Sequence, residues 1–148
     1  MYKRILVPLD GSELSETALV HAVALAKPLQ AQLVLLHVVV FLTRDFDVIP
    51  MEAASSAEVM ADAKRYLERT AGNVRRLGIA VTTSVESGRV ADTIVDYAVD
   101  HEVDLIVMST HGRTGAARWL IGSVADRVLR QSVSPVMIVR PQECAVTP

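Results

Sequence analysis

The chain has 148 residues, with 15 Lys and Arg against 17 Asp and Glu, so its formal net charge is −2. That length fits one domain able to bury about 70% of the surface of its unfolded chain, which makes disulfides or a structural metal unnecessary. The nearly balanced charge argues against a nucleic acid or a membrane surface as partner, so any anion site must be built locally.

The cellular setting is indicated by the single cysteine and by the opening residues. Cys144 cannot form an internal disulfide, so a reducing cytoplasm is the simplest interpretation. The chain enters an apolar strand at Ile5, and this opening is too short for the core of a signal peptide. The longest apolar run, residues 33–42, falls well short of the roughly 20 residues of a membrane span. We therefore expect a cytoplasmic protein without a membrane segment.

Short apolar runs alternate along the chain with stripes of apolar residues at helical spacing. Runs that are apolar on both faces are typical of parallel strands covered by helices on each side. In chain order, the pattern predicts a strand over 5–7, a helix over 14–29, a strand over 33–40, a helix over 53–77 ended by Gly78, a strand over 79–85, a helix over 90–98, a strand over 105–108, a helix over 124–129 and a strand over 136–139. This β-α-β alternation requires right-handed crossovers and a parallel sheet. We expect residues 1–141 to form a single domain, 41–50 to be a loop and 142–148 to be a flexible tail.

Ligands in open parallel sheets bind beyond the carboxyl ends of the strands, at the point where the strand order reverses. Residues 8–12, 39–40 and 87–89 follow the first three predicted strands. Asp10 could accept hydrogen bonds from a ribose or an adenine, or help hold a metal. The alternative is an Asp-Gly-Ser turn that caps the next helix. Val39 and Val40 could offer backbone groups to an adenine edge, while as side chains they belong to the core.

The longest irregular stretch follows the fourth predicted strand and covers residues 109–123. Three of the seven glycines fall in it: Gly112, Gly115 and Gly122. Glycines of this kind let a ligand approach the backbone amides closely. Ser123 is predicted as the N-cap of the next helix, with Asp126 as a capping-box acid, so the helix N-terminus could hold phosphate. The alternative is that the glycines only form turns.

Three charged or titratable side chains of the same stretch could contribute to this phosphate site. Arg113 and Arg118 could bring positive charge close to phosphates, and His111 could touch one or act as a general acid. A loop histidine without an identified partner is more often structural or solvated. The chain has no G-x-x-x-x-G-K-[ST] and no G-x-G-x-x-G, so it is not a P-loop NTPase and lacks a dinucleotide fingerprint. His37, in the second predicted strand, is interpreted as a core or surface residue.

Two motifs together resemble the universal stress protein family. The first is Pro8-Leu9-Asp10-Gly11-Ser12 after the first strand, and the second is Ser109-Thr110-His111-Gly112, nine residues, and then Gly122-Ser123. The resemblance covers residues 3–141. It implies an α/β three-layer sandwich, in which a five-stranded parallel sheet of order 3-2-1-4-5 carries helices on both faces. It also implies ATP as the ligand and a homodimer formed through the last strand, 136–139.

The resemblance further assigns residues to the ligand. Asp10 and a residue at 39–40 would meet the adenosine, and Gly112, Gly122 and Ser123 would meet the phosphates. The full set of predicted binding residues is Pro8, Leu9, Asp10, Val39, Val40, Met108, Ser109, His111, Gly112, Arg113, Gly122, Ser123 and Val124. Ser109 stands where the family pattern has glycine. Serine fits if the position needs only a small residue, and costs on the order of 1 kcal/mol if it needs a positive φ.

The function implied by the resemblance is that of a stress-response sensor or regulator that binds ATP and hydrolyses it slowly or not at all. A divalent ion, Mg²⁺ or Mn²⁺, would enter only as a companion of the phosphates. One alternative is a dimeric interaction module that binds no nucleotide. Another is an enzyme that cleaves ATP or transfers adenylate. The Pro-Leu-Asp-Gly-Ser sequence argues against this second alternative, because such enzymes carry S-G-G-x-D-S or H-x-G-H after the first strand.

Overall fold

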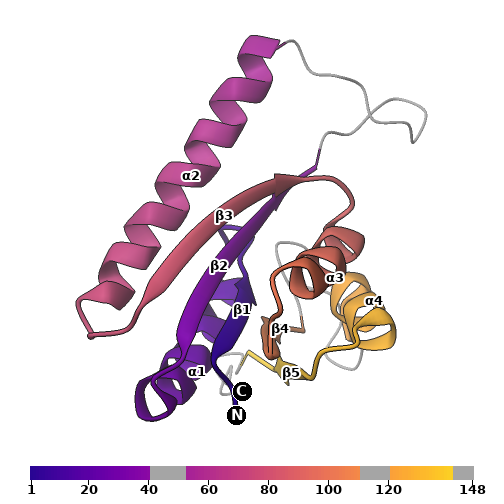
Figure 1. Ribbon diagram of the computed structural model, residues 1–148. Coiled ribbons are helices and arrows are strands. Elements are labelled where there is room, and N and C mark those ends of the chain that lie inside the picture. Colours follow the sequence, from indigo (N-terminus) through magenta and orange to yellow (C-terminus); the bar gives the residue numbers. More distant parts are fainter. Residues whose placement is uncertain (41–52, 111–120, 142–148) are drawn as a thin grey trace, which may run out of the picture.

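The computed structural model describes residues 1–40, 53–110 and 121–141. Within these ranges, five strands alternate with four helices (Figure 1): β1 (Arg4–Pro8), α1 (Glu13–Leu29), β2 (Gln32–Val39), α2 (Ala53–Arg75), β3 (Val81–Ser87), α3 (Val90–Asp100), β4 (Leu105–Ser109), α4 (Ser123–Gln131) and β5 (Val136–Val139). Neighbouring strands pair in parallel in one sheet of order β3-β2-β1-β4-β5. The predicted sheet and its strand order are therefore confirmed.

The helices cover the two faces of the sheet in pairs. Side chains alternate along each strand, so Ile5 and Val7 of β1 face α1 and α2, while Leu6 between them faces α3 and α4. All three are fully buried, as are the small residues of α1, such as Ala22, that let this helix lie close to the sheet. The central strands β1 and β4 are apolar on both faces, which is the reason that their sequences show no alternation.

The carboxyl end of α2 differs by two residues from the sequence-based expectation. The predicted helix over 53–77 ends at Arg75, so Gly78 follows the helix in a turn instead of stopping it directly. Gly78 nevertheless has φ +83°, the left-handed conformation for which glycine is suited. At the end of α1 the same conformation is adopted by Gln30, with φ 53°. The predicted loop 41–50 and the predicted tail 142–148 lie outside the described residues.

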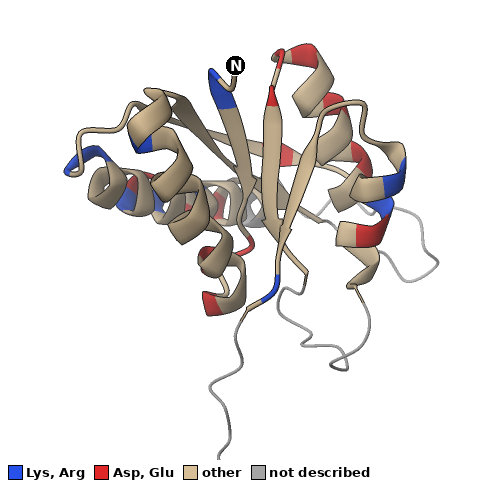
Figure 2. Ribbon diagram, turned by 90° about the horizontal axis from the view of Figure 1, so that it is seen from below, with Lys and Arg blue, Asp and Glu red and all other residues tan. Residues whose placement is uncertain are grey.

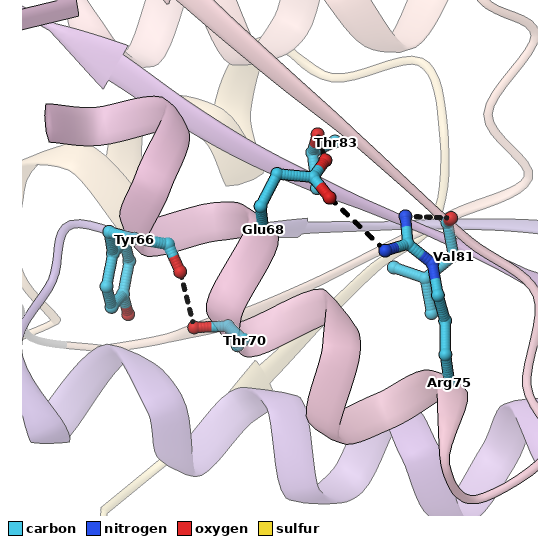
Figure 3. Close-up of polar contacts among 6 residues, drawn as sticks. All are labelled: Tyr66, Glu68, Thr70, Arg75, Val81 and Thr83. Atoms are coloured by element: carbon cyan, nitrogen blue, oxygen red, sulfur yellow. Dashed lines mark hydrogen bonds and ion pairs between the residues drawn. The ribbon is translucent and has the colours of Figure 1, made fainter. Parts of the chain in front are cut away.

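A group of side-chain hydrogen bonds attaches α2 to the edge strand β3 (Figure 3). Thr83 Oγ1 donates to Glu68 Oε1 at 2.7 Å, and Arg75 donates both to Glu68 Oε2 at 3.2 Å and to the Val81 carbonyl at 3.1 Å. These donors stabilise the carboxylate and hold the pKa of Glu68 below its usual value. Arg75 also satisfies the Val81 carbonyl of this edge strand. Unpaired backbone groups on an edge strand can otherwise pair with a strand of another chain.

Charges of both signs lie on both helical layers in the described part of the chain (Figure 2). This distribution accords with the small net charge of the whole sequence. In the same residue ranges, no helix has the length and apolar composition needed to cross a bilayer.

Candidate functional site at the carboxyl edge of the sheet

The strand order reverses between β1 and β4. From β1 the chain winds outward through β2 and β3, and it then returns to the other side of β1 to form β4 and β5. β1 and β4 pair directly, with Ile5 opposite Leu105 and Leu6 opposite Ile106. The segments that follow these two strands therefore begin at the same edge of the sheet, at the position where parallel sheets bind their ligands.

The segment after β1 is a tight turn organised by Asp10. Its Oδ1 accepts hydrogen bonds from the Ser12 backbone N–H at 2.9 Å and from Ser12 Oγ at 2.5 Å. Ser12 in turn caps α1, because its Oγ accepts from the Ser15 N–H at 3.1 Å. Gly11 between them has φ +88°. The turn interpretation of Asp10 is thus confirmed. A carboxylate has about four acceptor positions, so a role in this turn does not by itself exclude a contact with a ligand.

The end of β2 lies beside this turn. The Val39 side chain is 4% exposed and belongs to the core, whereas Val40 lies just beyond the strand and is 44% exposed. The Val39 carbonyl accepts a hydrogen bond from the Gly88 N–H at 3.2 Å, which fixes the end of β2 to the start of α3. A ligand at this edge would therefore meet Val39 only through its backbone, and Val40 through both its backbone and its side chain.

Other predicted contacts are restricted in the same way by burial. The side chains of Leu9 and Met108 are buried, on opposite faces of the sheet. Pro8, the last residue of β1, is half-buried and pairs with Leu36 of β2. Val124 is half-buried in the first turn of α4, where it packs against the α3 and α4 face. Of these residues, Leu9 and Met108 could meet a ligand only through their backbone.

Two backbone hydrogen bonds fix the ends of the segment that follows β4. We call this pair of bonds the neck. The Thr110 N–H donates to the Val139 carbonyl at 2.9 Å, and the Gly122 N–H donates to the Thr110 carbonyl at 2.8 Å. Ser109 and Thr110 are both buried. The neck therefore holds the end of β4, the start of α4 and the end of β5 together. His111, Gly112, Arg113, Gly115 and Arg118 lie outside the described residues, so their predicted contacts with phosphate stay predictions.

The backbone at Ser109 decides between the two expectations for this position. Ser109 is the last residue of β4 and pairs with Val139 in the sheet. Among the non-glycine residues that the structure describes, only Gln30 and Glu102 have a positive φ. Serine therefore carries no left-handed strain at position 109, and the predicted cost of about 1 kcal/mol does not arise.

The start of α4 differs by one residue from the prediction. Gly122, with φ −57° and ψ 153°, is the N-cap, and Ser123 is the first helical residue. The Gly122 carbonyl accepts the Asp126 N–H at 2.9 Å, and the Asp126 carboxylate pairs with Arg130 one turn later at 3.0 Å. The predicted capping box of Ser123 and Asp126 is therefore wrong. A glycine N-cap has no side chain to bind the amides of the first turn, which stay available to an anion.

The contacts of His37 at this edge were not predicted from the sequence. His37 Nδ1 lies 2.7 Å from the Leu9 carbonyl, and its ring meets the ring of Tyr66 edge-on, with centroids 6.4 Å apart. The Tyr66 hydroxyl donates to Glu16 Oε1 at 2.7 Å. Burial, followed by the bond to Glu16, raises the pKa of Tyr66. The available signal was the position of His37, a polar residue on the same face of its strand as the buried Leu33 and Leu35.

Comparison with known proteins identifies the family to which this chain belongs. A sequence model of the universal stress protein family matches residues 1–140. The chain belongs to this family. Universal stress protein MJ0531 of Methanocaldococcus jannaschii is 34% identical over 148 residues, which cover 95% of the chain and 83% of the relative.

Solved structures of the family agree with the fold. The structure of protein MJ0577, also from Methanocaldococcus jannaschii, has a TM-score of 0.85 and 33% identity, and the match covers 97% of this chain and 99% of that one. A universal stress protein in complex with cAMP has a TM-score of 0.72 and 25% identity, with 93% and 97% of the two chains covered.

Proposed function

We propose that this universal stress protein binds an adenine nucleotide, ATP, between the turn after β1 and the start of α4. The observation that carries the proposal is the meeting of two features at one edge of the sheet. The uncapped N-terminus of α4 starts at the neck, and the Asp10 turn follows the neighbouring strand. The first offers backbone N–H groups to phosphates, and the second offers a carboxylate to a ribose or an adenine.

The residues at this edge fit the parts of such a ligand. Asp10 and the backbone at 39–40 would bind the adenosine. Gly122, Ser123 and Val124 would bind the phosphates, together with Gly112 and His111 from the remaining loop. The φ of Gly122, −57°, is open to any residue, so its torsion does not require glycine. A need for close approach by a ligand would explain glycine there. The complex of a related family member with cAMP supports an adenine nucleotide.

A metal ion would be held mainly by the nucleotide itself. The described residues contain no group of three His, Cys, Asp or Glu side chains placed to hold a metal. Mg²⁺ commonly binds through substrate phosphates with one or two protein ligands, so Mg²⁺ or Mn²⁺ would accompany ATP.

We further propose that the protein is a cytoplasmic sensor or regulator in the stress response, with little or no ATPase activity. Fast hydrolysis needs a base held in place to activate water. In the described part of this edge, Asp10 Oδ1 accepts a hydrogen bond from Ser12, and His37 Nδ1 donates one to the Leu9 carbonyl. Both atoms are thus engaged within the protein instead of being placed to activate water. Binding would then act by ordering the site and changing a surface that a partner recognises.

The proposed assembly is a homodimer through β5. This strand pairs with β4 on one side and forms the end of the sheet. Its residues Val136, Met137 and Ile138 are only half-buried in the single chain. A short apolar edge of this kind can pair with the same strand of a second copy around a two-fold axis.

Nucleotide released from the purified, denatured protein and identified by mass spectrometry would test the proposal directly. Calorimetry with ATP on the emptied protein would follow, and the absence of both bound nucleotide and heat at millimolar ATP would refute it. Gly122→Val should abolish binding while it retains the fold, since valine tolerates the torsion angles of this position. Unchanged affinity in that variant would place the phosphates elsewhere.

A further inference from the structure

Three side chains from three elements form a series of contacts that ends at the peptide preceding Asp10. They are His37 of β2, Tyr66 of α2 and Glu16 of α1, and we call them the Leu9 bridge. His37 contacts the Leu9 carbonyl at 2.7 Å, Tyr66 meets the ring of His37, and Glu16 accepts the Tyr66 hydroxyl at 2.7 Å. The sequence separations are 28 residues for the first contact and 50 for the last, so only the fold brings these groups together.

The contact with the carbonyl fixes the hydrogen on the histidine. A carbonyl oxygen can only accept, so His37 must carry a hydrogen on Nδ1 when it makes this bond. In the neutral ring, Nε2 is then the atom without a hydrogen. The bond thus selects one of the two neutral forms of His37.

The peptide between Leu9 and Asp10 is held at both of its ends. His37 donates to its oxygen, and the N–H of the same peptide, which belongs to Asp10, donates to Ser15 Oγ at 3.3 Å. A peptide unit is planar, so two hydrogen bonds on opposite sides fix the orientation of the whole plane. That plane in turn sets the direction in which the chain enters the Asp10 turn.

The other end of the Leu9 bridge returns to the same turn. Glu16 lies in the first turn of α1, where its N–H donates to the Ser12 carbonyl at 3.3 Å. The negative charge of Asp10 also acts on Tyr66, where it contributes to the raised pKa. The bridge and the turn therefore form one closed polar unit around the end of β1.

We propose that His37 is a positioning residue for the adenosine part of the ligand. By fixing the Leu9–Asp10 peptide, it holds the Asp10 carboxylate in the binding orientation before the ligand arrives. A group ordered in advance spares the ligand the cost of ordering it, so the gain appears as affinity. This inference rests on the proposed function, because it concerns the same site.

Two substitutions separate the donor of His37 from its ring. His37→Asn places an amide N–H close to the position of Nδ1 and lacks the ring, whereas His37→Phe retains a ring against Tyr66 and lacks the donor. We expect His37→Phe to bind adenosine, AMP and ATP about three- to tenfold more weakly, the factor that matches one net hydrogen bond. His37→Asn should recover most of this loss.

The pattern across the three ligands distinguishes positioning from a general loss of stability. The factor should be the same for adenosine, AMP and ATP, because Asp10 is proposed to act on the adenosine alone. A loss that grows with the number of phosphates would overturn the inference. The affinities are measured by calorimetry at a temperature where each variant is fully folded, as judged by circular dichroism.

His101 supplies a matched control at the opposite edge of the sheet. Its Nδ1 also lies by a backbone carbonyl, that of Tyr97 at 3.0 Å, and its ring stacks on the same tyrosine at 3.8 Å. His101→Phe should leave all three affinities unchanged. A wild-type protein that binds none of the three ligands would refute the proposed function. Binding to wild type together with equal binding to His37→Phe would refute the positioning role alone.

Discussion

Three glycines with different surroundings predict three different effects of the same substitution to alanine. Gly88 has φ +146°, and a Cβ added there would lie 2.7 Å from Thr93 Oγ1. Gly78 has φ +83° with nothing within 4 Å of the added atom. Gly72 lies inside α2 with equally open space, and its φ is not positive. The series therefore separates backbone strain from steric overlap.

The magnitudes follow from these surroundings. Gly78→Ala should lower the free energy of unfolding by about 1–2 kcal/mol, the cost of a left-handed conformation with a Cβ. Gly88→Ala should lower it by about 1.5–3.5 kcal/mol, because moving the Thr93 side chain off its rotamer adds about 0.5–1.5 kcal/mol to the cost of the positive φ. Gly72→Ala should raise it by about 0.5–1 kcal/mol, since alanine is the better helix former.

Urea unfolding at one fixed protein concentration measures the series, with the slope m checked for constancy between variants. Thermal unfolding should rank the variants in the same order, with a Tm for Gly88→Ala that is roughly 5–10 °C below that of the wild-type protein. Equal losses for Gly88→Ala and Gly78→Ala would show that the contact with Thr93 has no energetic effect. A loss in Gly72→Ala would refute the reasoning as a whole, because nothing in its surroundings opposes the added methyl group.

Further predictions concern titration and assembly. The raised pKa of Tyr66 means that its contribution to stability is present below about pH 10, its usual value, and is lost as the pH rises further. Tyr66→Phe should therefore remove the latest phase of phenolate absorbance and flatten the loss of stability in strong base. The Arg4 and Lys3 N–H groups hold the pKa of Asp104 below its usual value, so its contribution is present above about pH 4 and lost as the pH falls. Asp104→Asn should lower stability at neutral pH by about 1 kcal/mol or less and flatten the acid limb, as followed by urea unfolding at several pH values. Ile138→Pro should give a monomeric mass by light scattering and retain the circular dichroism of the fold. If the mass stays that of a dimer, β5 is not the interface.

The fold could be predicted because its signals are local. The apolar runs of β1, β2 and β4 are buried on both faces, and that burial is visible in the sequence as an absence of alternation. The helix boundaries were predicted less accurately, and the predicted N-cap at Ser123 was one residue late. Glycine and serine are both good N-caps, so Gly122-Ser123 does not by itself decide which residue begins the helix.

The candidate site was predictable only in part. The Asp10 turn follows from a short motif, and its role as a turn was foreseen. The torsion of Ser109 was not, because it depends on how far β4 continues beside β5. The contacts of His37 with Leu9 and Tyr66 could not be foreseen either. They join residues far apart in sequence, and a single polar residue in an apolar strand does not reveal its partner.

The neck has a consequence for how this fold can diversify. It is closed by backbone groups of three residues, Thr110, Gly122 and Val139, and no side chain takes part in those two bonds. These two bonds therefore fix the spacing of β4 and α4 through the backbone alone, and they do not depend on which side chains lie between positions 110 and 122. Doubling the length of a flexible loop costs only about 0.6 kcal/mol in closure entropy. A library of grafted loops on this scaffold could thus select new anions while the sheet beneath stays the same.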